Sequence, residues 1–223
     1  MTFGRPDIAI GVVDVGSPKG GKLGWAVLSQ GEPPRLGKDL DAFVQVVTAL
    51  GAAHPLAIGF EAPLFIPTPS EAMRILSGRR GEGSRPWSAG AGAAVTTAAL
   101  AVVTYTLAGL RRGLPDATAS VDVSHPPQRP GDLLAFEAFV TASAKGVDHA
   151  NDALIAAREA SALLGGDRPY RSAIDEPEVF SLLGAALLRT GWTHDLTVLS
   201  APCLVVKPGF DHFSAESLPP PPD

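Results

Sequence analysis

The chain has 223 residues but only one cysteine, Cys203, and little net charge. A single cysteine excludes an intrachain disulfide framework and a zinc site built from several thiolates. The formal net charge of −5 argues against a protein that coats nucleic acid through bulk positive charge, although it leaves room for a local basic patch. The first residues lack the basic start and apolar run of a secretory signal, so we expect a cytoplasmic protein.

Internal repeats and linker-like boundaries are also missing from the sequence, and 45% of its residues are hydrophobic. We therefore expect one domain over residues 1–216, followed by a disordered Pro-rich tail over residues 217–223. Residues 89–110 carry no charge and are numerous enough to span a bilayer. Their richness in Ala, Thr and Gly favours a helix buried in the core, close to a sheet, so no membrane partner is expected.

Two apolar segments each end on a carboxylate. Residues 8–13 are mostly apolar and β-branched, which predicts a strand buried on both faces, and Asp14 follows directly. Residues 56–60 have the same character and are followed by Glu61. Because the carboxyl ends of parallel strands line one crevice, neighbouring strands would place these two acids side by side. Asp14 alone also fits a turn residue that caps its own backbone, and Glu61 alone fits an exposed strand end.

Basic residues accompany both acids. A glycine-rich turn follows Asp14, and Lys19 and Lys22 within it place positive charge beside that carboxylate. After Glu61, residues 66–87 are irregular and rich in arginine. Long irregular segments are usually functional or disordered, so this segment is either a phosphate-contacting flap or a solvated loop. The candidate substrate-binding residues are Lys19, Lys22, Arg79, Arg80 and Arg85.

Hydrophobic periodicity predicts the remaining elements. They are a strand at 23–28, a turn or edge strand within 31–37, helices at 39–53, 70–76 and 91–113, a strand at 117–124, helices at 133–143, 147–164 and 178–189, and a last strand at 204–206.

The predicted helix at 147–164 carries the third group of candidates. His149 and Asp152 are three residues apart, and Asp148 and Asp152 are four apart, so their side chains share a face at the first turn. That face adjoins a row of alanines, which directs it toward the body of the protein. Asp148 also fits the helix N-cap, where aspartate is favoured. Asp152 is the stronger candidate because it interrupts a small, apolar surface.

Taken together, this order of elements resembles the ribonuclease H-like fold. The resemblance implies an α/β fold whose mixed central sheet has three antiparallel strands followed by parallel strands, with helices on both faces. Asp14-Val-Gly-Ser with Gly24-Trp25, Glu61 after an apolar strand, and His149-Ala-Asn-Asp152 are similar to motifs of RuvC-like nucleases. Glu61-Ala-Pro-Leu with its arginine-rich loop resembles the predicted nucleases of the DUF429 family.

The resemblance covers about residues 8–164 and implies a metal-dependent nuclease. In such an enzyme Asp14 would bridge two Mg²⁺ or Mn²⁺ ions, and Glu61 and Asp152 would each hold one. His149 or Asp148 would complete the second site or transfer a proton. The implied partner is DNA or RNA, with a second copy of the chain as a further partner. The turn after Asp14 is longer than in the shortest resolvases and the chain is not strongly basic, so a Holliday junction is not the expected substrate.

Two other functions are compatible with the sequence. The glycine-rich hairpin is similar to the first phosphate loop of sugar kinases and actin-like ATPases, which suggests nucleotide binding or phosphotransfer. Those proteins usually duplicate the core, and 223 residues leave no room for a second copy. A non-catalytic binding module is the other alternative. Carboxylates more than about 8 Å apart, or a basic side chain occupying the cluster, would favour it.

Overall fold

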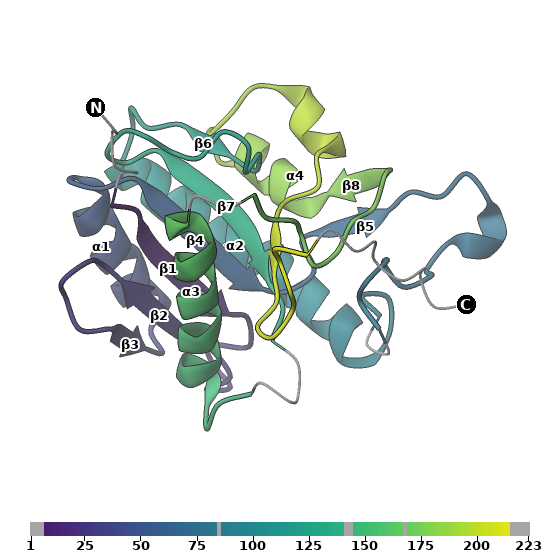
Figure 1. Cartoon of the computed structure of the whole chain (residues 1–223), viewed down its shortest axis with the longest axis horizontal. Helices are drawn as coiled ribbons and strands as arrows, with labels where there is room; N and C mark the ends of the chain where they lie inside the picture. Colours follow the sequence, from purple (N-terminus) through teal and green to yellow (C-terminus); the bar gives the residue numbers. More distant parts are fainter. Residues whose placement is uncertain (1–6, 84–85, 141–144, 167–168, 215–223) are drawn as a thin grey trace.

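The structure, a computed structural model, describes residues 7–83, 86–140, 145–166 and 169–214. Its main sheet has the strand order β3-β2-β1-β4-β7-β6, and β9 pairs with β7 (Figure 1). Three strands pair antiparallel, namely β1 (Ala9–Asp14), β2 (Gly24–Leu28) and β3 (Arg35–Gly37). Four strands continue the sheet in parallel with β1, namely β4 (Leu56–Glu61), β7 (Leu133–Ala138), β6 (Ala119–Ser120) and β9 (Val205–Val206). The expected α/β class and mixed sheet are confirmed.

Helices cover both faces of this sheet. The helices α1 (Leu40–Gly51), α2 (Gly90–Gly113) and α4 (Leu182–Arg189) contribute to the core on one face. The helix α3 (His149–Gly165) packs on the other face through its alanines (Figure 1). Small side chains let α3 lie close to the sheet, which brings its first turn near the strand ends.

Strand alternation decides which face each acid meets. Successive side chains of a strand point to opposite faces, and Val12 and Ala57 belong to the core beneath α3. Asp14 lies two residues after Val12, and Glu61 lies four after Ala57, so both acids point toward α3. Glu137 occupies the alternate position in β7, so its side chain points to the opposite face of the sheet, toward the core that α1, α2 and α4 form. The alternation therefore separates Glu137 from the two acids.

The predicted helix at 133–143 is wrong, because the segment forms the central strand β7. All six residues of β7 are buried, so the sequence shows no alternation between an inner and an outer face. A short apolar run buried on both faces cannot be told from a buried helical segment by periodicity alone.

Other boundaries also differ from those predicted. The helix expected at 70–76 is only the 3-10 turn η1 (Ala72–Arg74), and the strand expected at 117–124 shrinks to β6. The start of the helix expected at 178–189 is instead β8 (Val179–Ser181), which pairs with β5 (Phe65–Pro67). A further 3-10 helix, η3, spans Leu196–Ser200. The predicted tail at 217–223 lies outside the described residues.

The helix α2 has the length and apolar composition of a membrane-spanning helix. Some 39% of its most apolar 18-residue window is buried inside the protein, where it packs against α1 and α4. A core helix passes the same test, so this single helix is weak evidence for a membrane span.

Candidate metal centre

Asp14 and Glu61 end neighbouring parallel strands and are paired in register. They lie side by side, as the sequence predicted. Asp14 is only 6% exposed, and the Val140 amide donates a hydrogen bond to the Glu61 carboxyl. The other oxygen of that carboxyl, Oε2, is buried and finds no hydrogen-bond partner among the described residues. A buried oxygen without a partner is costly, which makes it a good position for a cation.

The first turn of α3 completes the cluster. His149 Nδ1 lies 2.6 Å from Asp14 Oδ2. Asp14, His149 and Asp152 each offer a ligand atom, and these atoms lie within 4.8 Å of one another. Asp152 is 4% exposed, so two buried carboxylates and one imidazole from distant parts of the chain converge here.

Gly24 allows α3 to approach this closely. A Cβ atom at position 24 would lie 2.3 Å from the backbone nitrogen of Ala150, which is far inside van der Waals contact. The start of β2 thus touches the backbone of the first turn of α3, and only glycine fits there. Gly24 therefore has a structural role in bringing His149 onto Asp14.

Burial sets the electrostatics of the two strand-end acids. It raises the pKa of Asp14, although the hydrogen bond from His149 acts in the opposite direction. Burial raises the pKa of Glu61 to about 9, and the negative charge of Asp14 adds to the effect. Without a bound cation, Glu61 consequently carries a proton at neutral pH.

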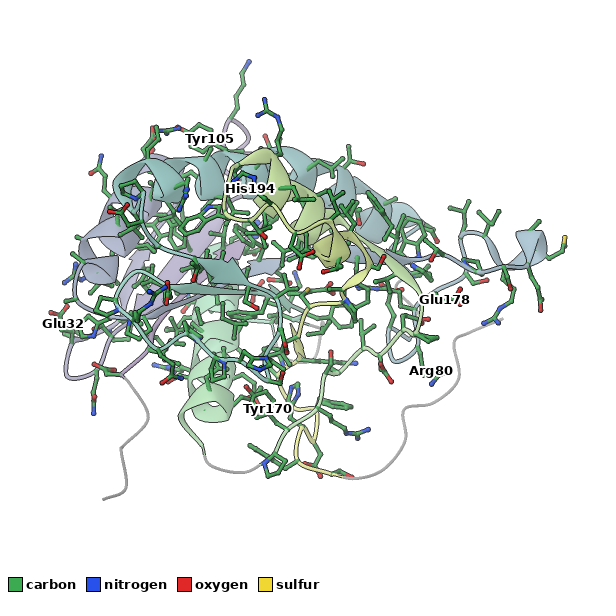
Figure 2. The ribbon with its side chains drawn as sticks, turned by 90° about the horizontal axis from the view of Figure 1, so that it is seen from above. Glu32, Arg80, Tyr105, Tyr170, Glu178 and His194 are labelled. Atoms are coloured by element: carbon green, nitrogen blue, oxygen red, sulfur yellow. The ribbon has the colours of Figure 1, made fainter. Side chains whose placement is uncertain are left out.

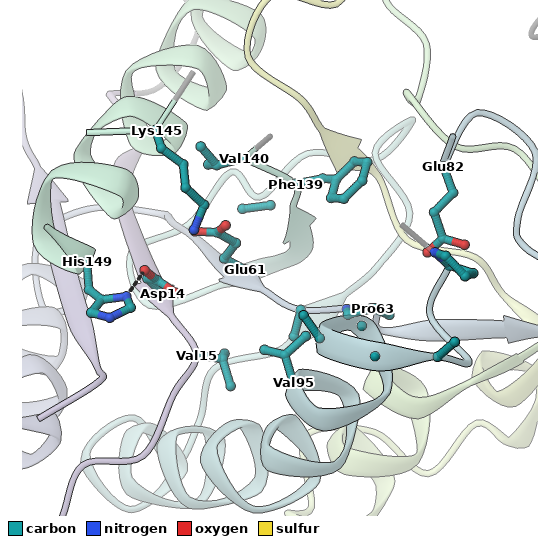
Figure 3. Close-up of a pocket in the computed structure, with 17 residues that line it drawn as sticks. Asp14, Val15, Glu61, Pro63, Glu82, Val95, Phe139, Val140, Lys145 and His149 are labelled. Atoms are coloured by element: carbon teal, nitrogen blue, oxygen red, sulfur yellow. Dashed lines mark hydrogen bonds and ion pairs between the residues drawn. The ribbon is translucent and has the colours of Figure 1, made fainter. Parts of the chain in front are cut away.

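Lys145 is the residue of this site that sequence reasoning missed. Its Nζ lies 3.5 Å from Asp152 Oδ2, and Figure 3 shows its side chain reaching to the Glu61 carboxyl. The amide of the next residue, Gly146, donates a hydrogen bond of 2.5 Å to Asp152 Oδ1. The only signal in the sequence is position, because Lys145 lies just before the helix that carries His149 and Asp152.

A cavity of about 640 Å³ opens above the acids. Asp14, Glu61, Lys145 and His149 lie together along it, and Phe139 extends from the strand end beyond them (Figure 3). Asp14, Glu61 and His149 are therefore accessible to a small molecule, whereas Asp152 is not among the residues that line the cavity.

Known proteins offer no match. The chain matches no protein-family model, no curated protein and no solved structure. Its function must consequently be inferred from the site itself.

Asp148 is not brought into the cluster, which corrects the expectation that it binds metal. Its Oδ1 accepts hydrogen bonds from the amide and the side chain of Asn151, and its Oδ2 lies 3.4 Å from Lys38 Nζ. The hydrogen bonds from Asn151 hold its pKa down, to about 2. The alternative interpretation as the helix N-cap is confirmed.

Arg79 is also placed differently from its expected role as a phosphate contact. Its side chain is fully buried and donates hydrogen bonds to both oxygens of Glu137, at 2.8 Å each, and to Glu82. It also lies over the ring of Phe65, 4.8 Å from the centroid. A guanidinium enclosed in this way anchors the loop to the sheet and cannot reach a substrate.

Three other basic candidates, Lys19, Lys22 and Arg80, do not line the cavity. Lys19 and Lys22 are exposed in the turn between β1 and β2. Arg80 is partly buried, its amide donates to the Glu176 carboxylate, and Figure 2 shows it on the same side of the molecule as Glu178. Phosphate contacts by these three residues stay predictions, and Arg85 lies outside the described residues.

The raised pKa of Glu61 predicts a pH-dependent metal affinity. A carboxyl group must lose its proton to bind a cation, so each Mn²⁺ bound below pH 9 should displace the proton of Glu61. We expect the affinity for Mn²⁺ to rise by up to about tenfold per pH unit between pH 6.5 and 8. Calorimetry in two buffers of different ionisation enthalpy measures both the affinity and the protons released. Glu61→Gln should remove that proton release, and an affinity independent of pH would contradict the assignment of Glu61 as a ligand.

Proposed function

We propose that this protein is a metal-dependent nuclease with a ribonuclease H-like fold, related to the RuvC-like and DUF429 proteins. The observation that carries the proposal is the convergence of Asp14, His149 and Asp152, with Glu61 paired beside Asp14 at the end of the neighbouring strand. The strand order β3-β2-β1-β4, antiparallel and then parallel, supports the fold assignment. Burial of the acids against one another supports a cation between them.

The donor set fits a hard divalent cation. Carboxylate oxygens are the ligands that Mg²⁺ and Mn²⁺ prefer, and the unpartnered Oε2 of Glu61 is available to one. Asp14, Glu61 and Asp152 would hold the metal, with Asp14 shared if two ions bind. The bound metal would supply an activated water and neutralise charge on the leaving oxygen.

The protein side chains would have distinct roles in hydrolysis. The contact with Asp14 fixes the ring of His149, which leaves the Nε2 atom of His149 free to transfer a proton. Lys145 places positive charge beside the acids, where the substrate phosphate would approach. Lys19, Lys22 and Arg80 would contact flanking phosphates outside the cavity.

The purified protein should therefore cleave a nucleic acid only with a divalent metal. The assay uses short single-stranded and duplex DNA and RNA with Mn²⁺ or Mg²⁺, and then an excess of chelator. We expect cleavage that stops with the chelator and returns when metal is added in excess. Binding of Mn²⁺ without cleavage of any of these substrates would contradict the nuclease assignment.

A non-catalytic binding module is the second candidate, because Lys145 already places an ammonium group beside Asp152. If the site takes metal, the ammonium competes with it, so Lys145→Met should bind Mn²⁺ more tightly than wild type. We expect a gain of about fivefold, since a partly exposed ion pair contributes on the order of 1 kcal/mol. Calorimetry measures it, and Lys19→Met, in an exposed turn, is the matched control. Mn²⁺ binding by the variant but not by wild type would favour the binding module.

A further inference from the structure

The cavity above the acids is small and mostly apolar. Its volume of about 640 Å³ lies within the range of roughly 300–1,000 Å³ typical of small-molecule sites. Apolar side chains that include Pro63, Val95, Phe139 and Val140 form much of its wall. The residues that surround the acids thus form a pocket and not an open track.

An interface for duplex nucleic acid has other properties. Specific protein–DNA interfaces bury about 1,000–2,500 Å² of protein surface and are strongly positive. Among the described residues that line the cavity, the basic groups are Lys145 and His149, and the acids are Asp14, Glu61 and Glu82. The first turn of α2, with Gly90, Ala91 and Gly92, lines one side of the pocket.

The aromatic side chain of the pocket, Phe139, lies close to the strand ends that carry the acids. Ala138, the last residue of β7, pairs in register with Glu61, and Phe139 is the first residue after that strand. Lys207 Nζ lies 5.1 Å from the centroid of the Phe139 ring, which helps to hold the ring in place. A ligand with a charged end and a flat apolar end would contact the acids with one end and the Phe139 ring with the other.

We propose that the pocket takes a single nucleotide unit, either a nucleoside monophosphate or the terminal nucleotide of a single strand. The inference rests on the proposed function, since the phosphate would meet a cation held by Asp14 and Glu61. The base would lie against Phe139, because aromatic side chains stack on bases irrespective of sequence. Cleavage would then start at a chain end and would not occur within a duplex.

Two alanines of α2 provide a matched pair of variants. Ala91 and Ala94 are both exposed on the helix, but only Ala91 lines the cavity. Ala91→Trp would place a large ring in the pocket, whereas Ala94→Trp places the same ring outside it. Neither residue belongs to the buried core, so both variants should fold. Phe139→Leu tests the stacking wall independently.

Calorimetry with Mn²⁺ alone, and then with thymidine 5′-monophosphate and Mn²⁺, decides the inference. We expect wild type and Ala94→Trp to bind the nucleotide equally, and Ala91→Trp and Phe139→Leu to bind it at least tenfold more weakly. All four proteins should bind Mn²⁺ alike. In a cleavage assay a linear single strand should be degraded from an end, whereas a circular strand of the same sequence resists. If wild type binds the nucleotide but does not cleave the linear strand, the ligand of the pocket is a free nucleotide and not the end of a strand.

The two possible failures are distinguishable. Wild type that binds Mn²⁺ but not the nucleotide, or an Ala91→Trp variant that equals Ala94→Trp, overturns the single-nucleotide pocket and leaves the metal site intact. Cleavage of the circular strand at the rate of the linear one also overturns it. A wild-type protein that binds no Mn²⁺ overturns the metal centre itself, and the pocket inference with it.

Discussion

Arg79→Leu is expected to destabilise the protein by about 3–5 kcal/mol, because it leaves two buried carboxylates without their partner. Glu137 is completely enclosed, and its carboxylate accepts both hydrogen bonds that link it to the guanidinium. Glu82, 3% exposed, loses the same partner. Urea unfolding measures the change, and for a domain of this size the melting temperature should fall by about 10 °C.

Arg80→Leu is the matched control for this variant. Arg80 is the next residue along the chain, but its side chain is partly exposed, so its loss should change stability by less than about 0.5 kcal/mol. Replacing Arg79, Glu82 and Glu137 together by apolar residues should recover much of the lost stability, since no charge is then left unpaired. Equal stability of Arg79→Leu and wild type would show that the network does not hold the loop.

This network shows where sequence reasoning failed and why. Arg79 lies in a loop with other arginines, so composition alone suggested a solvent-exposed phosphate contact. Its partner Glu137 lies in the middle of an apolar run whose pattern also predicts a helix. An acid inside a buried strand requires a partner, because a buried charge is paired or neutralised, and the helix prediction hides that requirement. The error in one element therefore concealed the role of a residue in another.

The acidic cluster was predictable because its signals are local. An acid at the end of a buried strand stands out, and the period of two fixes the face to which it points. The helical spacing of His149 and Asp152 is equally visible in the sequence. Lys145 was not predictable, since its position depends on how the chain enters α3. Asp148 was ambiguous because an N-cap and a metal ligand share the same residue type and place.

Asp14→Asn is expected to abolish metal-dependent cleavage without unfolding the protein. Asp14 is the residue that both pairs with Glu61 across the strands and contacts His149, so its carboxylate joins the two halves of the cluster. Loss of a group that only orients a metal ligand already costs about 10–100-fold in metal affinity, so loss of Asp14 as the proposed ligand should cost at least about 100-fold. Burial already raises the pKa of Asp14, which means that a neutral amide suits the position, and the melting temperature should stay the same or rise.

The control for Asp14→Asn is Asp122→Asn. Asp122 is also an aspartate but is exposed, and its carboxylate bonds to Ser124 and His125 within its own loop. This variant should keep wild-type Mn²⁺ affinity and cleavage, measured side by side with Asp14→Asn at equal protein concentration. Cleavage that persists in Asp14→Asn would reject the metal-dependent mechanism. Loss of cleavage with unchanged stability, in Asp14→Asn but not in Asp122→Asn, would place the chemistry at the strand-end cluster, because the two variants differ only in which carboxylate becomes an amide.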